Sequence, residues 1–305
     1  MNAFAVFERV LATVIPVFLI ALVGFAYARH KANVSIDAMN VIMLDILAPL
    51  LVFTSLADKG FDLYAQRWVI VGGVLVVIGS GLVAYPIARW RGWDINAFVP
   101  PAMFNNCGNM GLPLAVFAYG QTGLAAAIAL FTSSNLLHFT MGVKMLSPAA
   151  NIKQVLKTPL TMGMILGLIA NALNAYTGVH MPAPLQDGLS MLGKAAIPLM
   201  LFMLGVRMAQ SKLDHIGAGL ACGVVSSAAG LFTAWIVHFF IPLSPAEYAY
   251  VLLFASLPPA VLNVLMATQY KADVPATTSA VVWGHVVSLV AVPIAVAWGV
   301  LESGL

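Results

Sequence analysis

The sequence predicts an all-α integral membrane protein with ten transmembrane helices, arranged as two inverted five-helix repeats. Of its 305 residues, 61% are hydrophobic and 8% are charged, whereas soluble domains have about 25% charged residues. Apolar runs of about 20 residues, the length needed to cross a bilayer, recur along the chain. The net charge of +3 gives no indication of nucleic-acid binding, because the basic residues lie mostly in the predicted loops.

Ten apolar segments follow one another, and we expect each to span the membrane. The first lacks a basic leader and has full spanning length, which argues against a cleavable signal. The longest polar stretch, residues 147–158, divides the chain into a first repeat (1–150) and a second repeat (151–305). The predicted spans are residues 7–28, 35–57, 68–88, 97–119, 123–145, 159–176, 184–208, 216–241, 246–270 and 274–301.

The distribution of basic residues predicts the orientation. Ten of them fall on one side of the predicted spans and three on the other, so the richer side is cytoplasmic and both termini lie outside. Because each half has an odd number of spans, the second half is inverted relative to the first. The inner set is Arg29, Lys31, Arg89, Arg91, Lys144, Lys153, Lys157, Arg207, Lys212 and Lys271, and the outer set is Arg9, Lys59 and Arg67.

The fourth span has an unusual centre, which reads Pro-Pro-Ala-Met-Phe-Asn-Asn-Cys-Gly-Asn-Met-Gly-Leu-Pro over residues 100–113. Proline removes a backbone donor and glycine weakens a helix. Freed backbone groups cost several kcal/mol each in hydrocarbon unless protein or a water-lined cavity satisfies them. We therefore expect a helix broken at mid-membrane beside a polar site. Its predicted binding residues are Asn105, Asn106, Gly108 and Asn109, with Gly111 and Pro113 as a hinge.

The ninth span has a similar centre, Leu-Pro-Pro-Ala-Val-Leu-Asn, over residues 257–263. An offset of 158 residues carries the first Pro-Pro-Ala onto the second and Asn105 onto Asn263. Two interrupted spans at corresponding positions of two halves indicate the binding site of a secondary transporter. We expect Pro258, Pro259 and Asn263 to contribute to that site.

Two charged residues lie near the middle of predicted spans, Asp45 in the second and Lys194 in the seventh. A charge at the bilayer centre costs about 2.5–3.5 kcal/mol on insertion scales and commonly marks function. An offset of 149 residues relates the two positions. As a polar coupling pair they would bind an anion, carry a proton on Asp45 or switch between states; alternatively they form a buried ion pair that holds the halves together.

Further polar residues occur in the last span of each half. His285 in the tenth span and Asn135 in the fifth lie at comparable depths and are candidate binding residues, with satisfied packing as the alternative. His138 adds polarity to the fifth span. In the sixth span, the spacing Gly163-x-x-x-Gly167 predicts a close helix–helix approach.

Enzyme motifs do not occur: the chain has no Gly-x-Ser-x-Gly, His-Glu-x-x-His or Walker sequence. Its two cysteines, Cys107 and Cys222, lie in apolar spans and indicate neither a disulfide framework nor a metal site. We therefore predict that the protein is not an enzyme and holds no metal or cofactor.

Two segments resemble the crossover regions of the auxin efflux carrier family: Asn-Cys-Gly-Asn-Met-Gly-Leu-Pro-Leu from residue 106, and residues 257–270. The resemblance covers essentially the whole chain, and the short 147–158 loop is of the bacterial type. It implies a fold shared with bile-acid/sodium symporters. Spans one, two, six and seven would form a scaffold that dimerises, and spans three to five and eight to ten a transport domain in which spans four and nine cross.

The resemblance also bears on the predicted site. Asn105 and Asn106 match the first crossover, and Pro258, Pro259 and Asn263 match the second. Asp45 and Lys194 match polar positions on the scaffold side of the substrate cavity. Asn105 and Asn263 stand where plant exporters often have proline, which argues against plant-type auxin specificity.

The sequence thus predicts a carrier of small organic anions, namely carboxylates, that works by alternating access in the bacterial cytoplasmic membrane, and the resemblance implies that it is a homodimer. Half-helix N-termini and asparagine amides favour an anion. The broken centres contain no Asp or Glu, so uniport or proton coupling ranks above sodium coupling. The alternatives are a sodium-coupled symporter of the bile-acid type and a membrane receptor that binds an acid without moving it.

Overall fold

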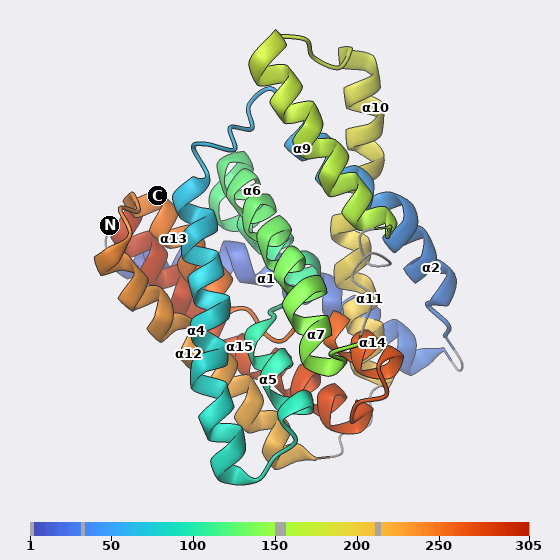
Figure 1. Cartoon of the computed structure of the whole chain (residues 1–305), viewed down its shortest axis with the longest axis vertical. Coiled ribbons are helices and arrows are strands. Elements are labelled where there is room, and N and C mark those ends of the chain that lie inside the picture. The colour runs from blue at the N-terminus through green and yellow to red at the C-terminus, as the bar shows by residue number, and fades with distance from the viewer. Residues whose placement is uncertain (1–2, 32–33, 150–156, 211–214, 305) are drawn as a thin grey trace. The chain divides into compact units, whose positions relative to one another are not determined.

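All secondary structure that the computed structural model describes is helical (Figure 1). It describes residues 3–31, 34–149, 157–210 and 215–304. Two of the basic residues used for the orientation, Lys153 and Lys212, and the predicted boundary between repeats at residue 150 lie outside these ranges. Among the described residues, an isolated antiparallel β-bridge between Asn105 and Pro259 is the one β-type pairing.

Within the described ranges, eight helical segments are long and apolar enough to cross a membrane, so the chain is a multi-pass integral membrane protein. The predicted fourth and fifth spans share one of these segments, which bends at Gly120 (φ 66°). The predicted ninth span is split into two shorter helices, and the count of ten remains a prediction. The eight are Phe4–His30, Asp37–Leu56, Arg67–Arg91, Cys107–Leu146, Pro159–Thr177, Ala183–Gln210, Ile216–Phe240 and Val274–Ser303.

The chain divides by its internal contacts into two compact units. Unit 1 comprises Met1–Pro16, Trp68–Ala150 and Ser211–Leu305, and unit 2 comprises Val17–Arg67 and Asn151–Gln210. The division falls inside the first helix, α1 (Ala3–His30), directly after its proline at position 16.

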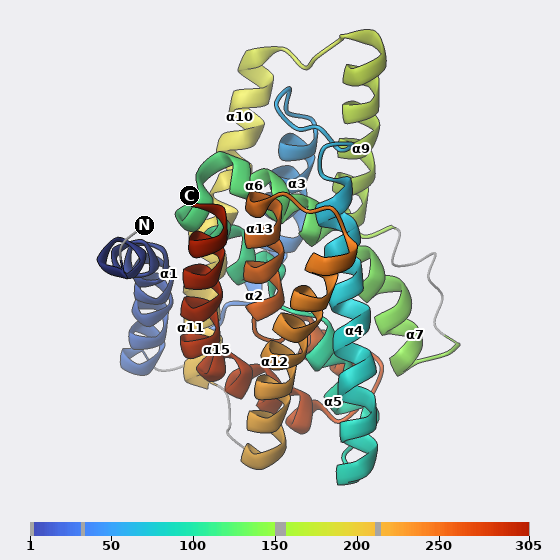
Figure 2. The same cartoon turned by 90° about the vertical axis from the view of Figure 1, so that its left-hand side faces the viewer.

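In unit 1, α12, α13 and α15 pack against one another (Figure 2). Glycine permits this close packing, because a Cβ on Gly223 would lie 2.7 Å from the Cα of Gly284 in α15. Ser244 and Glu247 form a capping box that starts α13. The elements of unit 1 after α1 are α4 (Arg67–Arg91), α5 (Ile95–Met103), η2 (Cys107–Gly111), α6 (Leu112–Leu137), η3 (His138–Gly142), α7 (Val143–Leu146), α12 (Ile216–Phe240), α13 (Pro245–Ser256), α14 (Leu262–Gln269) and α15 (Val274–Ser303).

In unit 2, α9 and α10 pack on α3. The close approach predicted from Gly163-x-x-x-Gly167 is confirmed: a Cβ on Gly163 would lie 2.7 Å from the carbonyl oxygen of Pro49, and one on Gly167 would lie 2.9 Å from Cβ of Leu56. The elements of unit 2 after α1 are α2 (Asp37–Ile42), η1 (Met43–Leu47), α3 (Ala48–Leu56), α9 (Pro159–Thr177), α10 (Ala183–Lys194) and α11 (Ala196–Gln210).

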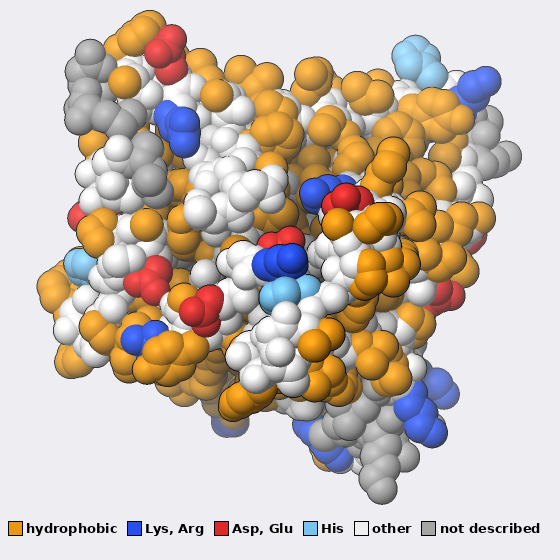
Figure 3. Space-filling view, turned by 90° about the horizontal axis from the view of Figure 1, so that it is seen from above, with side chains coloured by type: hydrophobic (Ala, Val, Ile, Leu, Met, Phe, Trp, Pro, Cys, Tyr) orange, Lys and Arg blue, Asp and Glu red, His pale blue; other side chains and the backbone are white. Residues whose placement is uncertain are grey.

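Large hydrophobic side chains are abundant on the exposed surface (Figure 3). Leu82 is 73% exposed, Tyr176 90% and Phe240 79%. Water would disfavour so much exposed apolar area, whereas a lipid environment accepts it. The surface therefore agrees with the membrane assignment made from the helices.

Candidate functional site

The first break in unit 1 lies between α5, which ends at Met103, and η2, which begins at Cys107. The second lies between α13, which ends at Ser256, and α14, which begins at Leu262. Helices are thus interrupted within both stretches that the sequence singled out. Leu257 precedes a proline and is extended (φ −65°, ψ 146°), as the steric clash of a following proline ring favours.

The predicted equivalence of the two Pro-Pro-Ala sequences is wrong. Pro100 and Pro101 lie inside α5, whereas Pro258 and Pro259 lie in the second break itself. Asn105 is likewise a break residue, while Asn263 lies in the first turn of α14. Pro100 and Pro101 are tolerated because they lie near the end of the short helix α5, where each proline removes a single backbone hydrogen bond.

The backbones of the two breaks bond directly to each other. The N–H of Asn106 donates to the carbonyl oxygen of Pro258 at 2.7 Å, and the N–H of Ala260 donates to that of Phe104 at 2.8 Å. Such groups would be costly to leave unpaired in a membrane interior. Each break therefore satisfies backbone groups of the other, although about 150 residues separate them.

Asparagine side chains reinforce this pairing. Asn105 donates through Nδ2 to the carbonyl oxygen of Phe254 at 2.6 Å. Asn263 donates through Nδ2 to the carbonyl oxygens of Phe104 at 3.0 Å and Ala260 at 2.9 Å. These amides are buried. They bond carbonyl oxygens at the ends of the half-helices and do not face open space.

Two histidines complete the network in a reciprocal manner. Asn106 of the first break lies 3.0 Å from Nε2 of His285 in α15, and Asn263 of the second break lies 3.0 Å from Nε2 of His138 in η3. The ring of His138 also stacks on Phe104, with centroids 4.1 Å apart and planes at 5°. Each break is thus bonded to the histidine that belongs to the other half of the sequence.

His138 was not among the binding residues chosen from the sequence, where it was noted for its polarity alone. Its position in the sequence could have identified it as a site residue, because His138 and His285 each lie in the last predicted span of a half. Asn135, which was chosen instead, is buried and donates to the carbonyl oxygen of Phe131 in its own helix at 2.8 Å. The structure thus places a histidine, rather than Asn135, in the role corresponding to His285.

Asn109 differs from the other asparagines of the two breaks. It is half-buried, as is neighbouring Gly108. Its side chain and its backbone N–H make no hydrogen bond within the described residues. It lies in η2 directly before α6, where the first orphan donors of a helix point outward. Gly111 ends η2, and Pro113 lies in the first turn of α6.

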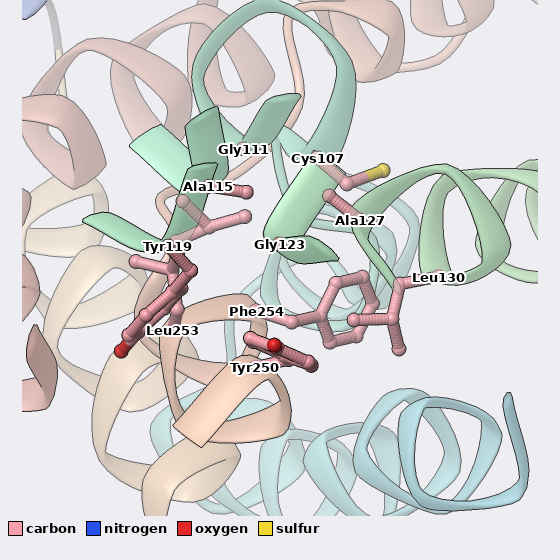
Figure 4. A pocket seen from close by; sticks show the side chains of 11 residues that line it. Cys107, Gly111, Ala115, Tyr119, Gly123, Ala127, Leu130, Tyr250, Leu253 and Phe254 are labelled. Carbon is pink, nitrogen blue, oxygen red and sulfur yellow. The ribbon is translucent and has the colours of Figure 1, made fainter. Parts of the chain in front are cut away.

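A small apolar pocket lies next to the breaks in unit 1 (Figure 4). The hydroxyl of Tyr119 is buried there without a hydrogen-bond partner in the described part of the chain. The lining has no charged side chain, so this pocket is not a contact for an ionised group. It is lined by Cys107, Gly111, Ala115, Tyr119, Gly123, Ala127, Leu130, Tyr250, Leu253, Phe254 and Leu257.

Asp45 and Lys194 belong to unit 2. Asp45 lies in the π-helical turn η1, and Lys194 is the last residue of α10, directly before the interruption that separates α10 from α11. Both side chains are exposed, and no ion pair joins them within the described ranges. Both therefore lie at irregular points of their helices. The π-helical turn that contains Asp45 is of a kind that is frequent at functional sites.

The described side chains include no group of three or more His, Cys, Asp or Glu that could hold a metal ion. The site instead consists of amides, imidazoles and backbone groups. These are hydrogen-bonding groups of the kind that fix the orientation of a small molecule in a binding site.

Comparison with known proteins agrees with these features. A family model described as "Membrane transport protein" matches residues 149–296. An uncharacterized transporter of Methanothermobacter thermautotrophicus is 26% identical over 303 residues, covering 95% of this chain and 97% of its own length. An uncharacterized transporter of Methanocaldococcus jannaschii is 23% identical, over 72% of this chain and 73% of its own.

A third relative, named a putative malonate transporter, from Rhizobium meliloti, is 32% identical over 124 residues, which is 38% of either chain. The family match and the shared transporter names agree with the membrane-spanning helices and the motifs at the two breaks. The chain is therefore similar to membrane transport proteins over residues 149–296 and to proteins named as transporters over most of its length.

Proposed function

We propose that this protein is a secondary carrier that moves small organic carboxylates across the cytoplasmic membrane by alternating access. The substrate binds at the paired breaks of unit 1, where the predicted fourth and ninth spans cross. One relative is named a putative malonate transporter, which makes short dicarboxylates the first substrates to test.

The observation that carries this proposal is the half-buried, unengaged Asn109. Its amide and backbone N–H supply hydrogen-bond donors at the start of a long helix, where the helix dipole favours negative charge. Asn105, Asn106 and Asn263 already bond protein groups. Asn109 is therefore the first of the four to meet a carboxylate, and the others form the support behind it.

The division into units supports the proposed movement. Unit 2 contains most of the first predicted span and all of the second, sixth and seventh, while unit 1 contains the third to fifth and the eighth to tenth. This division follows the scaffold and transport domains that the family resemblance implies. We infer that unit 1 carries the substrate and that unit 2 is the dimerising scaffold, with Asp45 and Lys194 as its polar pair.

The test is tracer uptake of malonate and malate into proteoliposomes without sodium, comparing the wild type with Asn109→Ala. A hydrogen bond to a charged group is worth about 1.5–3 kcal/mol, so we expect roughly 10- to 150-fold weaker substrate binding in the variant. Asn96→Ala is the matched control, because Asn96 is exposed in the first turn of α5. Unchanged affinity in Asn109→Ala would refute the site, and no carboxylate uptake by the wild type would refute the function.

A further inference from the structure

The hydrogen bonds fix which nitrogen of His285 carries its proton. Nδ1 lies 2.7 Å from the carbonyl oxygen of Val281, and a carbonyl can only accept, so Nδ1 is the donor. In the neutral ring Nε2 then has a lone pair. It accepts from Nδ2 of Asn106 at 3.0 Å.

His138 has the opposite tautomer. Nδ2 of Asn263 donates to two carbonyl oxygens, those of Phe104 and Ala260, which turns its Oδ1 toward Nε2 of His138 at 3.0 Å. Because Oδ1 accepts, Nε2 of His138 carries the proton and Nδ1 has the lone pair.

The two rings therefore respond differently to a second proton. On His138 the proton goes to Nδ1, and the bond from Nε2 to Asn263 is kept. On His285 the second proton goes to Nε2. The new N–H then faces the NH₂ group of Asn106, and because both groups are donors, the hydrogen bond between them is lost. Asn106 must then turn its amide oxygen toward the ring, or an anion must accept the new proton.

The acidic groups at the two ends of α15 lie far from His285. The helices that pack against α15 are α5, α12, α13 and α14. Along α15, the capping Asp273 is 12 residues from His285 and Glu302 is 17 residues away, which is about 18 Å and about 26 Å of helix. Besides His285 itself, the titratable groups carried by these helices and their caps are Asp94, His215, Cys222, His238, Glu247, Tyr248, Tyr250, Tyr270, Asp273 and Glu302, and Tyr119 of α6 also reaches α15 at Gly299.

Cys222 belongs to the part of α12 that packs beside His285, because the next residue, Gly223, abuts Gly284. Its thiol donates to the carbonyl oxygen of Phe98 at 3.5 Å. Among the acidic groups, Asp94, Glu247 and Asp273 belong to the N-terminal caps and first turns of their helices. Since α15 and the helices packed against it carry their acidic groups near their ends, we infer that a bound anion is the negative partner of a protonated His285.

We propose that His285 is the proton-binding residue of a proton–carboxylate symporter. This inference rests on the proposed carboxylate transport. As the carboxylate enters, a proton from the aqueous phase on the same side binds Nε2 of His285. Asn106 then no longer donates to the ring. Its amide becomes a second hydrogen-bond donor to the anion, beside that of Asn109. Burying an anion with its proton avoids the cost of burying an uncompensated charge, and both leave on the other side.

The experiment combines carboxylate uptake with an internal pH dye in proteoliposomes. For the wild type, uptake carries protons inward, and lower external pH raises affinity, by up to about tenfold per pH unit where one proton is taken up. His285→Gln places an amide near Nε2 that cannot titrate. It should still move carboxylate, with nearly flat pH dependence and no proton flow. The matched control His238→Gln, at an exposed histidine of α12 outside the two breaks, should keep the proton flow.

Proton flow that persists in His285→Gln at the wild-type ratio to carboxylate would overturn the proposal. So would wild-type uptake that moves no protons, although carboxylate transport itself would then stand. A wild type that transports no carboxylate would instead refute the proposed function. If His285→Gln fails to fold, calorimetry of malonate binding to the wild type in two buffers of different ionisation enthalpy decides, because equal heats mean that no proton is taken up.

Discussion

Asparagine side chains at the two breaks have two different roles. Asn105, Asn106 and Asn263 bond carbonyl oxygens or an imidazole inside the protein. Asn109 is half-buried and bonds no described group. An amide suits both roles, because it donates and accepts without carrying a charge that a low-dielectric interior would penalise.

At this scale, Asn263→Ala should destabilise the protein as well as abolish transport. It removes a second donor from the carbonyl oxygens of Phe104 and Ala260, which keep their backbone partners, and it removes the acceptor of Nε2–H of His138. A buried donor left unsatisfied in this way costs about 1–3 kcal/mol. We expect a clearly lower unfolding temperature in detergent, measured by a thermal-shift assay. Asn135→Ala, which removes a single bond within its own helix, should lower it less. Equal unfolding temperatures for the two variants would contradict this account.

At the scale of elements, the sequence predicted where helices are interrupted but not how the interruptions meet. Proline, glycine and asparagine in an apolar run weaken a helix locally, and this effect can be read from neighbouring residues. The hydrogen bond from Asn106 to Pro258 joins residues far apart in sequence, and the spacing of residues along the chain does not predict it. The offset of 158 residues gave a wrong equivalence for the same reason. It aligned identical residue types that occupy different positions relative to the helix ends.

Helix packing in unit 2 gives a second prediction at this scale. Gly163→Ala would place a Cβ 2.7 Å from the carbonyl oxygen of Pro49 and 3.0 Å from its Cα. These are backbone atoms that cannot rotate away, so α9 must move from α3, and overpacking of this kind costs about 1–3 kcal/mol. The unfolding temperature should fall. Gly188→Ala in α10 is the control, since nothing lies within 4 Å of its Cβ position; a similar fall there would contradict the prediction.

For the whole molecule, the distribution of basic residues predicts that both termini are outside. Lys31 and Lys59 are exposed and fall on opposite predicted sides. In intact cells, an impermeant maleimide should label Lys59→Cys and leave Lys31→Cys unlabelled until the membrane is opened. The natural Cys107 and Cys222 are both buried, which keeps the background low. Labelling of Lys31→Cys in intact cells would reverse the orientation.

The bonds between the two breaks also govern how the chain is made. When Asn106 leaves the ribosome, its partner Pro258 is still 152 residues away in the message. At 5–20 residues per second, this leaves the first break incomplete for roughly 8–30 s. During that interval a nascent chain holds unpaired backbone groups within the bilayer. A truncated product that ends before residue 257 never acquires the missing bonds, so it should be recognised and degraded by membrane quality control.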